Sequence, residues 1–386
     1  MSDVVIVSAA RTAIGTFGGS LADTSNIDLA SAVIKEAVDR AGIDAGLIDE
    51  VVLGCVGQIG ESGFLTRAAS LKAGLPLSVT GYSVNRQCGS GLQALVEAFL
   101  LIKQGRADLV VAGGVENMSA LPYYLHKARF GYKMGHGVLD DGLTSILTWP
   151  NAPYHNGKTA ENLANLYSIS RKEQDDYAYK SQLKAKRAIE KGEFRQQILP
   201  MQVGRGKSAK VFDTDEHPKD LGREKLDSLK PAFDPNGSVT AANASGINDG
   251  AAALLLTSRK KAKELGLKPV LHMQDYEVAG LDPDVMGLGP VWAIKKLLER
   301  MNISLKDIDN FEINEAFAVQ ALACAKELGL DLDKLNTQGG AIALGHPVGA
   351  SGAILPVKIF HQNHSLSIAS LCIGGGQGIC AIFKKE

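Results

Sequence analysis

The fold is decided by a stretch that occurs twice. Arg40-Ala-Gly-Ile43-Asp-Ala-Gly-Leu-Ile48-Asp49-Glu-Val51 recurs as Arg300-Met-Asn-Ile303-Ser-Leu-Lys-Asp-Ile308-Asp309-Asn-Phe311, with the arginine, both isoleucines and the aspartate matching at an offset of 260 residues. Each copy follows an amphipathic helical pattern, at residues 30–40 and 291–300, and leads into an apolar strand. Internal similarity over this distance predicts two copies of one structural unit.

Later landmarks repeat in the same way. Gly89-Ser90-Gly91 opens one helical pattern and Ala350-Ser351-Gly352 opens another, 261 residues later. Each helix leads to a strand that ends in paired glycines, Leu109–Gly114 and Leu371–Gly375, with the glycine pairs again 261 residues apart. Because strand and helix patterns alternate within each copy, the sequence predicts two α/β halves.

Between the copies the composition changes. Turn-rich segments such as Asp234-Pro235-Asn236-Gly237 appear, and the helical stretch Arg171–Lys191 is so charged that we expect a solvated face. The apolar pattern of the first half resumes at residues 250–256. We therefore predict an N-terminal half of residues 1–118 plus 249–266, an inserted loop domain of residues 119–248, and a C-terminal half of residues 267–386.

Composition excludes several classes of protein. The 386 residues are 45% hydrophobic and 22% charged, which is typical of a folded globular chain. The net charge of −1 provides no basic field for nucleic acid, and no apolar run approaches the roughly 18 residues of a membrane span. Residues 1–8 predict a strand instead of a signal peptide, and residues 382–386 are not a peroxisomal address. Five cysteines without a C-x-x-C pair argue against disulfides or a thiolate metal site, so we expect a cytoplasmic protein with free cysteines.

One of these cysteines lies in a setting suited to chemistry. Residues 85–91 (Asn-Arg-Gln-Cys-Gly-Ser-Gly) place Cys88 on a turn before a helix whose apolar positions share one face, and Gly105 is placed to end that helix. The N–H groups and dipole at a helix N-terminus stabilise a thiolate. A buried structural cysteine beside a packing turn is an almost equally good interpretation.

A histidine and a second cysteine have comparable settings. His346 lies in the glycine-rich segment 339–352, where it could activate a cysteine, whereas His361 and His364 are expected at the surface. Cys372 ends an apolar strand, and the glycines after it lack the spacing of a dinucleotide loop. Asn314 follows the repeated strand, where its amide could position a water or donate to an oxyanion.

Together these motifs resemble the thiolase family over essentially the whole chain. The resemblance implies two βαβαβαββ halves in a five-layered α-β-α-β-α core, an inserted loop domain that binds CoA, and a homotetramer (dimer of dimers) or homodimer. It implies an acyltransferase whose substrates are acetyl-CoA, acetoacetyl-CoA and CoA, without metal or organic cofactor. The matching segments are residues 85–91, 113–119, 243–251, 314–317, 345–347 and 372–378.

The resemblance also implies a role for each residue at the reacting centre. Cys88 would be the nucleophile that becomes acylated, His346 would activate it, and Cys372 would be the acid and base for the second substrate. One oxyanion hole would comprise His346 and a water held by Asn314. The other would use the backbone N–H groups of Cys88 and Gly374, since the enolate in Claisen chemistry needs fixed donors.

Substrate contacts follow from the same resemblance, together with two departures. His155 belongs to the predicted substrate site, but residues 155–157 read His-Asn-Gly where short-chain members typically read His-Met-Gly, and the stretch from Leu143 to His155 is about four residues longer than usual. Lys219 stands where the family often has arginine and could meet a CoA phosphate as a point charge. The remaining matches are Leu143, Phe233 and Ser245 in the pantetheine tunnel, and Met286 and Phe317 in the acyl pocket.

These departures leave chain-length preference open. A 3-ketoacyl-CoA thiolase acting on longer chains is the nearest alternative within the family. A ketosynthase would use two histidines with its cysteine, so Cys372 argues against it. A catalytically silent acyl-CoA-binding protein of the same fold would be expected to lack catalytic groups, yet Cys88, His346, Cys372 and Asn314 are all present.

Overall fold

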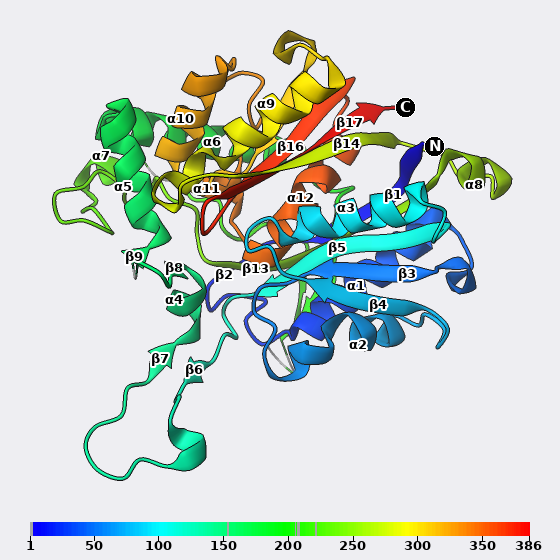
Figure 1. The fold of residues 1–386 in the computed structure, drawn as a ribbon, viewed down its shortest axis with the longest axis horizontal. Helices are drawn as coiled ribbons and strands as arrows, with labels where there is room; N and C mark the ends of the chain where they lie inside the picture. The colour runs from blue at the N-terminus through cyan, green and yellow to red at the C-terminus, as the bar shows by residue number, and fades with distance from the viewer. Residues whose placement is uncertain (1–2, 153, 205, 207–208, 221) are drawn as a thin grey trace.

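One mixed sheet runs through the molecule (Figure 1), and equivalent strands of its two halves follow one another in opposite spatial order. The computed structural model describes residues 3–152, 154–204, 206, 209–220 and 222–386. In spatial order the sheet contains β15 (Asn310–Ile313), β16 (Leu366–Ile373), β17 (Gln377–Lys385), β14 (Leu271–Gly280), β1 (Val4–Thr12), β13 (Asn248–Ser258), β5 (Leu109–Asn117), β3 (Glu50–Gly54) and β4 (Thr80–Val84). The short strands β2 (Gly15–Thr16) and β10 (Ile198–Leu199) pair with β13 and β1. The strand predicted at residues 1–8 is thus present as β1, with Met1 and Ser2 outside the described residues.

The order of elements confirms the predicted repeat. The first half runs β1-α1-β3-α2-β4-α3-β5-β13, with helices α1 (Asn26–Ala41), α2 (Leu65–Lys72) and α3 (Ser90–Lys103). The second runs β14-α9-β15-α10-α12-β16-β17, with helices α9 (Gly289–Met301), α10 (Ala318–Leu328) and α12 (Val348–His361). The strand that would correspond to β4 is reduced to one parallel bridge between Phe311 and Leu335.

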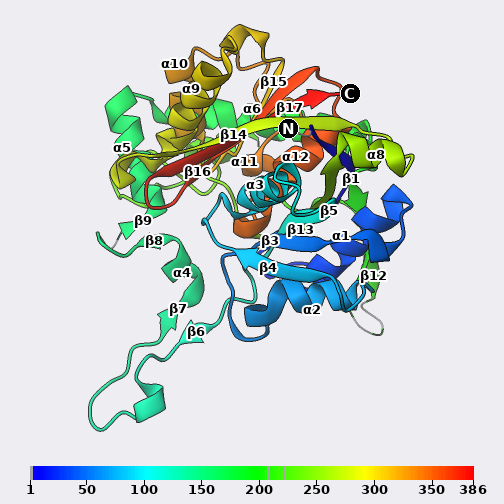
Figure 2. The ribbon, with the colours of Figure 1, turned by 45° about the vertical axis from the view of Figure 1, so that its right-hand side comes forward.

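Five layers result from the way the halves meet. Antiparallel pairing of β1 with β14 joins the two sets of strands at residues 4–6 and 271–273. Helices α3 and α12 pack together between the two sets, while α1 and α2 cover the outer side of one and α9 and α10 lie outside the other (Figures 1 and 2). Gly91 and Gly352 allow the central contact, because a Cβ at either position would overlap the backbone of the facing helix.

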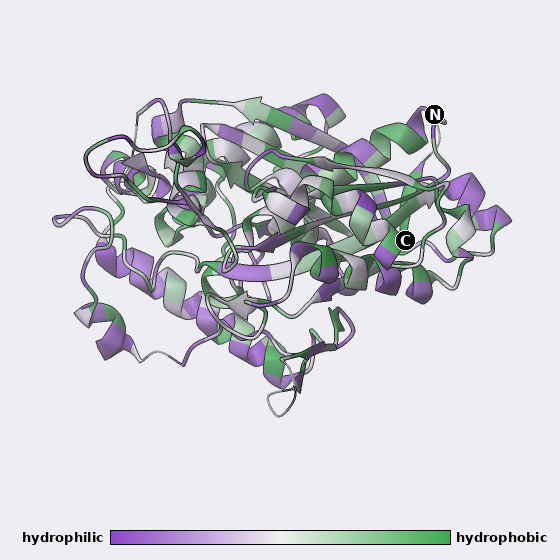
Figure 3. Cartoon of the chain, turned by 90° about the horizontal axis from the view of Figure 1, so that it is seen from below, coloured by the Kyte–Doolittle hydropathy of each residue, from purple (hydrophilic) through white to green (hydrophobic). Residues whose placement is uncertain are grey.

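The core consists of strands covered on both faces. Every residue of β5 and β13 is buried, and the hydropathy colours of Figure 3 show apolar strands inside and hydrophilic helix faces outside. Sheets covered by helices on both sides require such nearly continuous apolar runs. The same rule explains why residues 250–256 resemble a strand without alternation.

Between β5 and β13 the chain forms short hairpins and several helices. The hairpins are β6 (Tyr123–Tyr124) with β7 (Asp140–Asp141), β8 (Thr148–Trp149) with β9 (Tyr154–His155), and β11 (Met201–Val203) with β12 (Lys210–Phe212). The helices are α4 (Gly142–Ile146), α5 (Asn156–Tyr167), α6 (Arg171–Glu190) and α7 (Arg223–Ser228). The segment around β6 and β7 projects from the body as an arm at the lower left of Figure 1. The three-domain division stays a prediction. Outside this segment lie α8 (Arg259–Glu264) and α11 (Ala341–Leu344).

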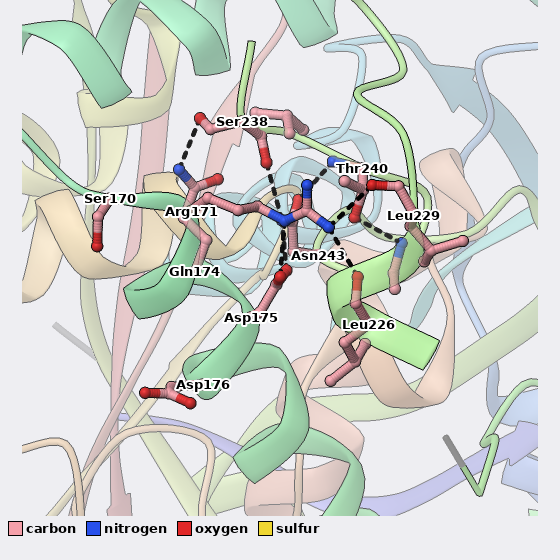
Figure 4. Close-up of polar contacts among 12 residues, drawn as sticks. Ser170, Arg171, Gln174, Asp175, Asp176, Leu226, Leu229, Ser238, Thr240 and Asn243 are labelled. Carbon is pink, nitrogen blue, oxygen red and sulfur yellow. Dashed lines mark hydrogen bonds and ion pairs between the residues drawn. The ribbon is translucent and has the colours of Figure 1, made fainter. Parts of the chain in front are cut away.

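Helix α6 has the expected solvated face, with Lys172, Glu173 and Lys186 among its exposed residues, but its other side is buried. Arg171 donates to Asp175 at 2.6 Å and to two backbone carbonyls of α7 and its C-cap. Asn243 donates to the same carboxylate at 2.8 Å (Figure 4). These bonds fix the chain that leads into Ser245, so α6 supports one wall of the cavity described next.

Candidate active site

The sequence-predicted cysteines and histidine meet in one cavity of about 490 Å³. Cys88 comes from the turn before α3, His346 from the loop before α12, and Cys372 from the end of β16. Both halves therefore contribute to the site. Residues of the segment between β5 and β13 complete the wall, among them Leu147, His155, Asn156, His217, Lys219, Phe233, Ser245 and Ile247.

Cys88 is held in a tight turn beside a backbone donor. Gln87 has a φ of 47°, and the Cys88 side chain is buried against the Gly374 N–H. Burial raises the pKa of the Cys88 thiol to about 11, although the N–H groups of Gly374 and Cys88 itself act in the opposite direction. Backbone N–H groups at this turn thus favour the thiolate, as expected from the helix N-terminus, but desolvation has the larger effect on the pKa.

His346 is a neutral imidazole with a defined tautomer. Burial lowers its pKa to about 4. Its Nδ1 lies 2.6 Å from Ser351 Oγ, and that hydroxyl donates its single proton to the Pro347 carbonyl at 2.9 Å. Ser351 can therefore only accept from Nδ1, which places the imidazole proton on Nδ1 and leaves Nε2 unprotonated. A neutral imidazole with an unprotonated Nε2 can act as a base.

Asn314 lies behind His346. Its Nδ2 is 3.3 Å from His346 Nε2, its side chain is buried, and it is not among the residues that line the cavity. The Asn314 backbone N–H donates to the Ser370 carbonyl, which ties this residue to β16. The structure thus brings Asn314 to the histidine, behind the residues that line the cavity.

Among Cys88, His346 and Cys372, the last is the most enclosed, with 1% of its surface exposed. Burial raises the pKa of its thiol, and the negative charge of a Cys88 thiolate would raise it further. Gly375 and Gly376 have φ angles of 87° and 83° and form the tight turn between β16 and β17. The glycine run therefore serves this turn, and it leaves the Gly374 N–H pointing at Cys88.

Six of the seven predicted substrate residues line the cavity. Leu143 does not: it packs in a small apolar cluster with Cys88, Met118 and Val348, and Leu147, four residues later, lines the cavity instead. The six that line it are His155, Lys219, Phe233, Ser245, Met286 and Phe317.

Aromatic stacking builds one wall. The His155 ring stacks on Phe233 at 4.8 Å between centroids, and Phe233 meets Phe317 edge-to-face at 5.9 Å. His155 Nδ1 accepts the Gly157 N–H at 3.0 Å, and burial lowers the pKa of this histidine. His155 therefore caps α5 and presents an apolar ring face to Phe233.

Sequence reasoning assigned no role to two supporting residues, although both lie in segments that it singled out. Glu116 is a fully buried carboxylate that accepts the N–H groups of Val56, Gly57 and Gly349, each at 2.9 Å. It connects the end of β3 to the start of α12, and burial raises its pKa. Ser351 belongs to the motif Ala350-Ser351-Gly352 that opens a helix, but the sequence suggested no function for its side chain. A lone acid in an apolar strand was the available signal for Glu116.

Cys55, Cys88, Cys324, Cys372 and Cys380 are free and buried. Within the described ranges, no group of three or more His, Cys, Asp or Glu side chains is arranged to hold a metal ion. No helix in that part of the chain is long and apolar enough to cross a membrane.

Comparisons with known proteins agree with this architecture. Models of the thiolase N-terminal and C-terminal domains match residues 4–260 and 267–385. Acetyl-CoA acetyltransferases of Escherichia coli strain K12 and Pseudomonas aeruginosa are 50% and 48% identical, each over 100% of both chains. The crystal structure of Bacillus anthracis acetyl-CoA acetyltransferase superposes with a TM-score of 0.98 at 46% identity, covering 100% of this chain and 99% of that one. Human mitochondrial 3-ketoacyl-CoA thiolase gives 0.97 at 38% identity with the same coverage. The chain therefore belongs to the thiolase family, and it is an acyltransferase.

Proposed function

We propose that this enzyme is an acetyl-CoA C-acetyltransferase, which condenses two acetyl-CoA reversibly into acetoacetyl-CoA and CoA. The observation that carries the proposal is the meeting of Cys88, His346, Cys372 and the Gly374 N–H at one cavity. The 46–50% identity to bacterial enzymes named acetyl-CoA acetyltransferase supports the same substrate class.

Acylation is the first half of the proposed ping-pong reaction. His346 Nε2 takes the Cys88 proton as the sulfur bonds the thioester carbon, because a thiol with a pKa of about 11 needs a base at neutral pH. The bond to the CoA sulfur then breaks as Cys372 gives that sulfur its own proton, which leaves a Cys372 thiolate and a His346 that is protonated at Nε2. Acetyl-Cys88 and free CoA result.

Condensation is the second half. The Cys372 thiolate takes a proton from the methyl of a second acetyl-CoA, and the resulting carbanion attacks the acetyl carbon on Cys88. The Cys88 sulfur leaves with the proton that His346 has held since acylation, while Cys372 keeps the methyl proton, so both thiols are restored. The Cys88 and Gly374 N–H groups and His346, with a water held by Asn314, would stabilise the two oxyanions. We propose no metal or organic cofactor.

A thiolase acting on longer 3-ketoacyl-CoA chains is the second candidate, supported by the likeness to the human mitochondrial 3-ketoacyl-CoA thiolase. Initial rates of thiolysis from C4 to C8 substrates separate the two. We expect the highest kcat/KM at C4, and an equal or higher value at C8 would favour the second candidate. Absence of turnover on every chain length would support the non-catalytic acyl-CoA-binding protein.

We expect the projecting arm around β6 and β7 to form subunit contacts of the predicted homotetramer. The arm exposes large apolar side chains that a lone chain would leave in water, including Tyr123, Phe130, Met134, Val138 and Leu139. We propose that arms of different subunits pack together, so replacing residues 125–139 by a short Gly-Ser linker should convert tetramers into dimers in light scattering. An unchanged mass would contradict this. The cytoplasmic location stays a prediction, to be tested by cell fractionation.

A further inference from the structure

We infer that Asn156 makes the acyl pocket selective for short acyl groups that carry a hydrogen-bonding oxygen on their carbon chain. This inference rests on the proposed function and adds a substrate class to it. Asn156 lines the cavity that contains Cys88, His346 and Cys372. Its amide nitrogen lies 3.2 Å from where a Cβ on Gly374 would stand, so the amide lies against the turn whose N–H faces Cys88.

The backbone around Asn156 is fixed by the neighbouring hairpin. The Asn156 N–H donates to the Leu147 carbonyl at 2.9 Å, and Thr148 pairs with His155 across β8 and β9. Trp149 packs on the same turn, 2.8 Å from where a Cβ on Gly375 would stand. The amide is therefore held beside the acyl position by its own segment.

The Asn156 side-chain amide is not used to cap a helix or to hold the described part of the chain together. His155 supplies the cap of α5, and the Asn156 side chain makes no hydrogen bond to any residue that the structure describes. Much of the remaining cavity lining is apolar, including Phe233, Met286 and Phe317. A polar amide that faces an open cavity is hydrated, so an entering acyl chain has to displace water from it.

Displacing that water gives selectivity. An all-carbon acyl chain leaves the amide without a partner, which is costly in an apolar cavity, whereas a chain oxygen restores the hydrogen bond. A site with a committed polar group discriminates more strongly against an analogue that lacks the matching oxygen than against one that differs by a methylene. We expect a preference of about tenfold, the effect of one neutral hydrogen bond.

The test is a competition between acyl donors of the same shape. Glycolyl-CoA and propionyl-CoA differ by a hydroxyl in place of a methyl, and 3-hydroxypropionyl-CoA and butyryl-CoA form a second pair with the oxygen one carbon further. Each pair is mixed at equal concentration with enzyme and quenched rapidly. Mass spectrometry of the Cys88 peptide then gives the ratio of the two acyl-enzymes, which equals the ratio of their kcat/KM values for acylation.

Variants assign the effect to the amide. Asn156→Leu keeps the shape and removes the polar atoms, and Asn156→Met is a second apolar replacement should the first fail to fold. Asn165→Leu makes the same change at an exposed position of the same helix and serves as the control. In at least one pair, the oxygen-bearing to all-carbon ratio should fall about tenfold in the Asn156 variants and stay at the wild-type value in Asn165→Leu.

The outcomes separate this inference from the proposed function. If the ratios for both pairs are the same in wild type and in the Asn156 variants, the inference is overturned. If no donor, acetyl-CoA included, labels Cys88 in the wild type, the proposed function fails instead. If neither variant folds, the wild-type ratio decides, and a preference for the all-carbon donor in both pairs overturns the inference.

Discussion

His346 Nδ1 and Ser351 Oγ lie 2.6 Å apart, and both residues are almost fully buried. The Ser351 hydroxyl donates its hydrogen bond to the Pro347 carbonyl one helical turn earlier, as serines in helices commonly do. The tautomer of the histidine is therefore fixed by a residue that does not line the cavity. Ser351 is a positioning residue, which acts through His346.

Ser351→Ala should lower kcat at least about tenfold with little change in the KM for acetyl-CoA, because part of the His346 population then carries its proton on Nε2. Alkylation of Cys88 by iodoacetamide should slow in parallel, since it needs the same base. Ser351→Thr keeps the hydroxyl and should restore most of the activity.

Ser70→Ala is the matched control for this prediction. Ser70 is also buried and donates to the carbonyl four residues earlier, at 2.7 Å, but it lies in α2. Both alanine variants should lose similar thermal stability. Equal kcat values in the two variants would show that the Ser351 hydroxyl is only structural.

The two cysteines should separate by the step that each serves. Acylation needs a nucleophile and a base, and CoA leaves tolerably as a thiolate because a thiol has a pKa near 8.5. Carbon–carbon bond formation must deprotonate a much weaker carbon acid, so it requires a positioned base. Cys372→Ala should still form some acetyl-Cys88 while condensation falls by orders of magnitude, and Cys88→Ala should lose both.

Two measurements check this separation. Mass spectrometry detects the acetyl group on the Cys88 peptide, and proton exchange at the acetyl methyl in heavy water reports the base. The exchange should vanish in Cys372→Ala. Near wild-type condensation by that variant would mean that another group removes the proton.

The sequence predicted the fold well because the repeat is visible without tertiary information. Helices predicted at residues 30–40 and 291–300 are α1 and α9, since amphipathic periodicity is a local property. Cys88, His346 and Cys372 were found because glycines around them signal turns, and their meeting in one cavity follows from the paired halves.

The features that the sequence did not predict depend on contacts between residues far apart in the chain. The buried side of α6 contacts Glu315, which accepts from Tyr177 and Ser181 more than 130 residues away. The raised pKa of the Cys88 thiol is a consequence of burial, which a turn motif does not report. His361 was expected at the surface, yet its ring is mostly buried against the body.

Glu116→Gln should destabilise the protein by about 2–4 kcal/mol, because a buried charged acceptor that faces several donors loses one oxygen. Three N–H groups converge on this carboxylate, and the new amide would oppose at least one of them. Urea unfolding measures the loss. A change below about 0.5 kcal/mol would show that the carboxyl is protonated and that the amide replaces it well.

Stability should also fall on mild acidification, and His361 should account for a defined part of the fall. Burial, helped by the positive charge of Arg40, lowers the pKa of His361 to about 4, against roughly 6.5 in the unfolded chain. Between these values the unfolded chain binds a proton that the folded chain does not, so the free energy of unfolding decreases as the pH falls. At pH 5 this amounts to about 2 kcal/mol relative to pH 7.5.

His361→Gln removes this titration, so the loss of unfolding free energy from pH 7.5 to pH 5 should be about 2 kcal/mol smaller than in the wild type. His136→Gln, on the exposed arm, is the control and should keep the wild-type loss. Urea titrations of the wild type and of both variants at each pH give the three losses to be compared. Because other buried groups titrate in the same range, only the contrast between the two variants tests the claim, and equal losses in both would mean that His361 is protonated in the folded protein at pH 5.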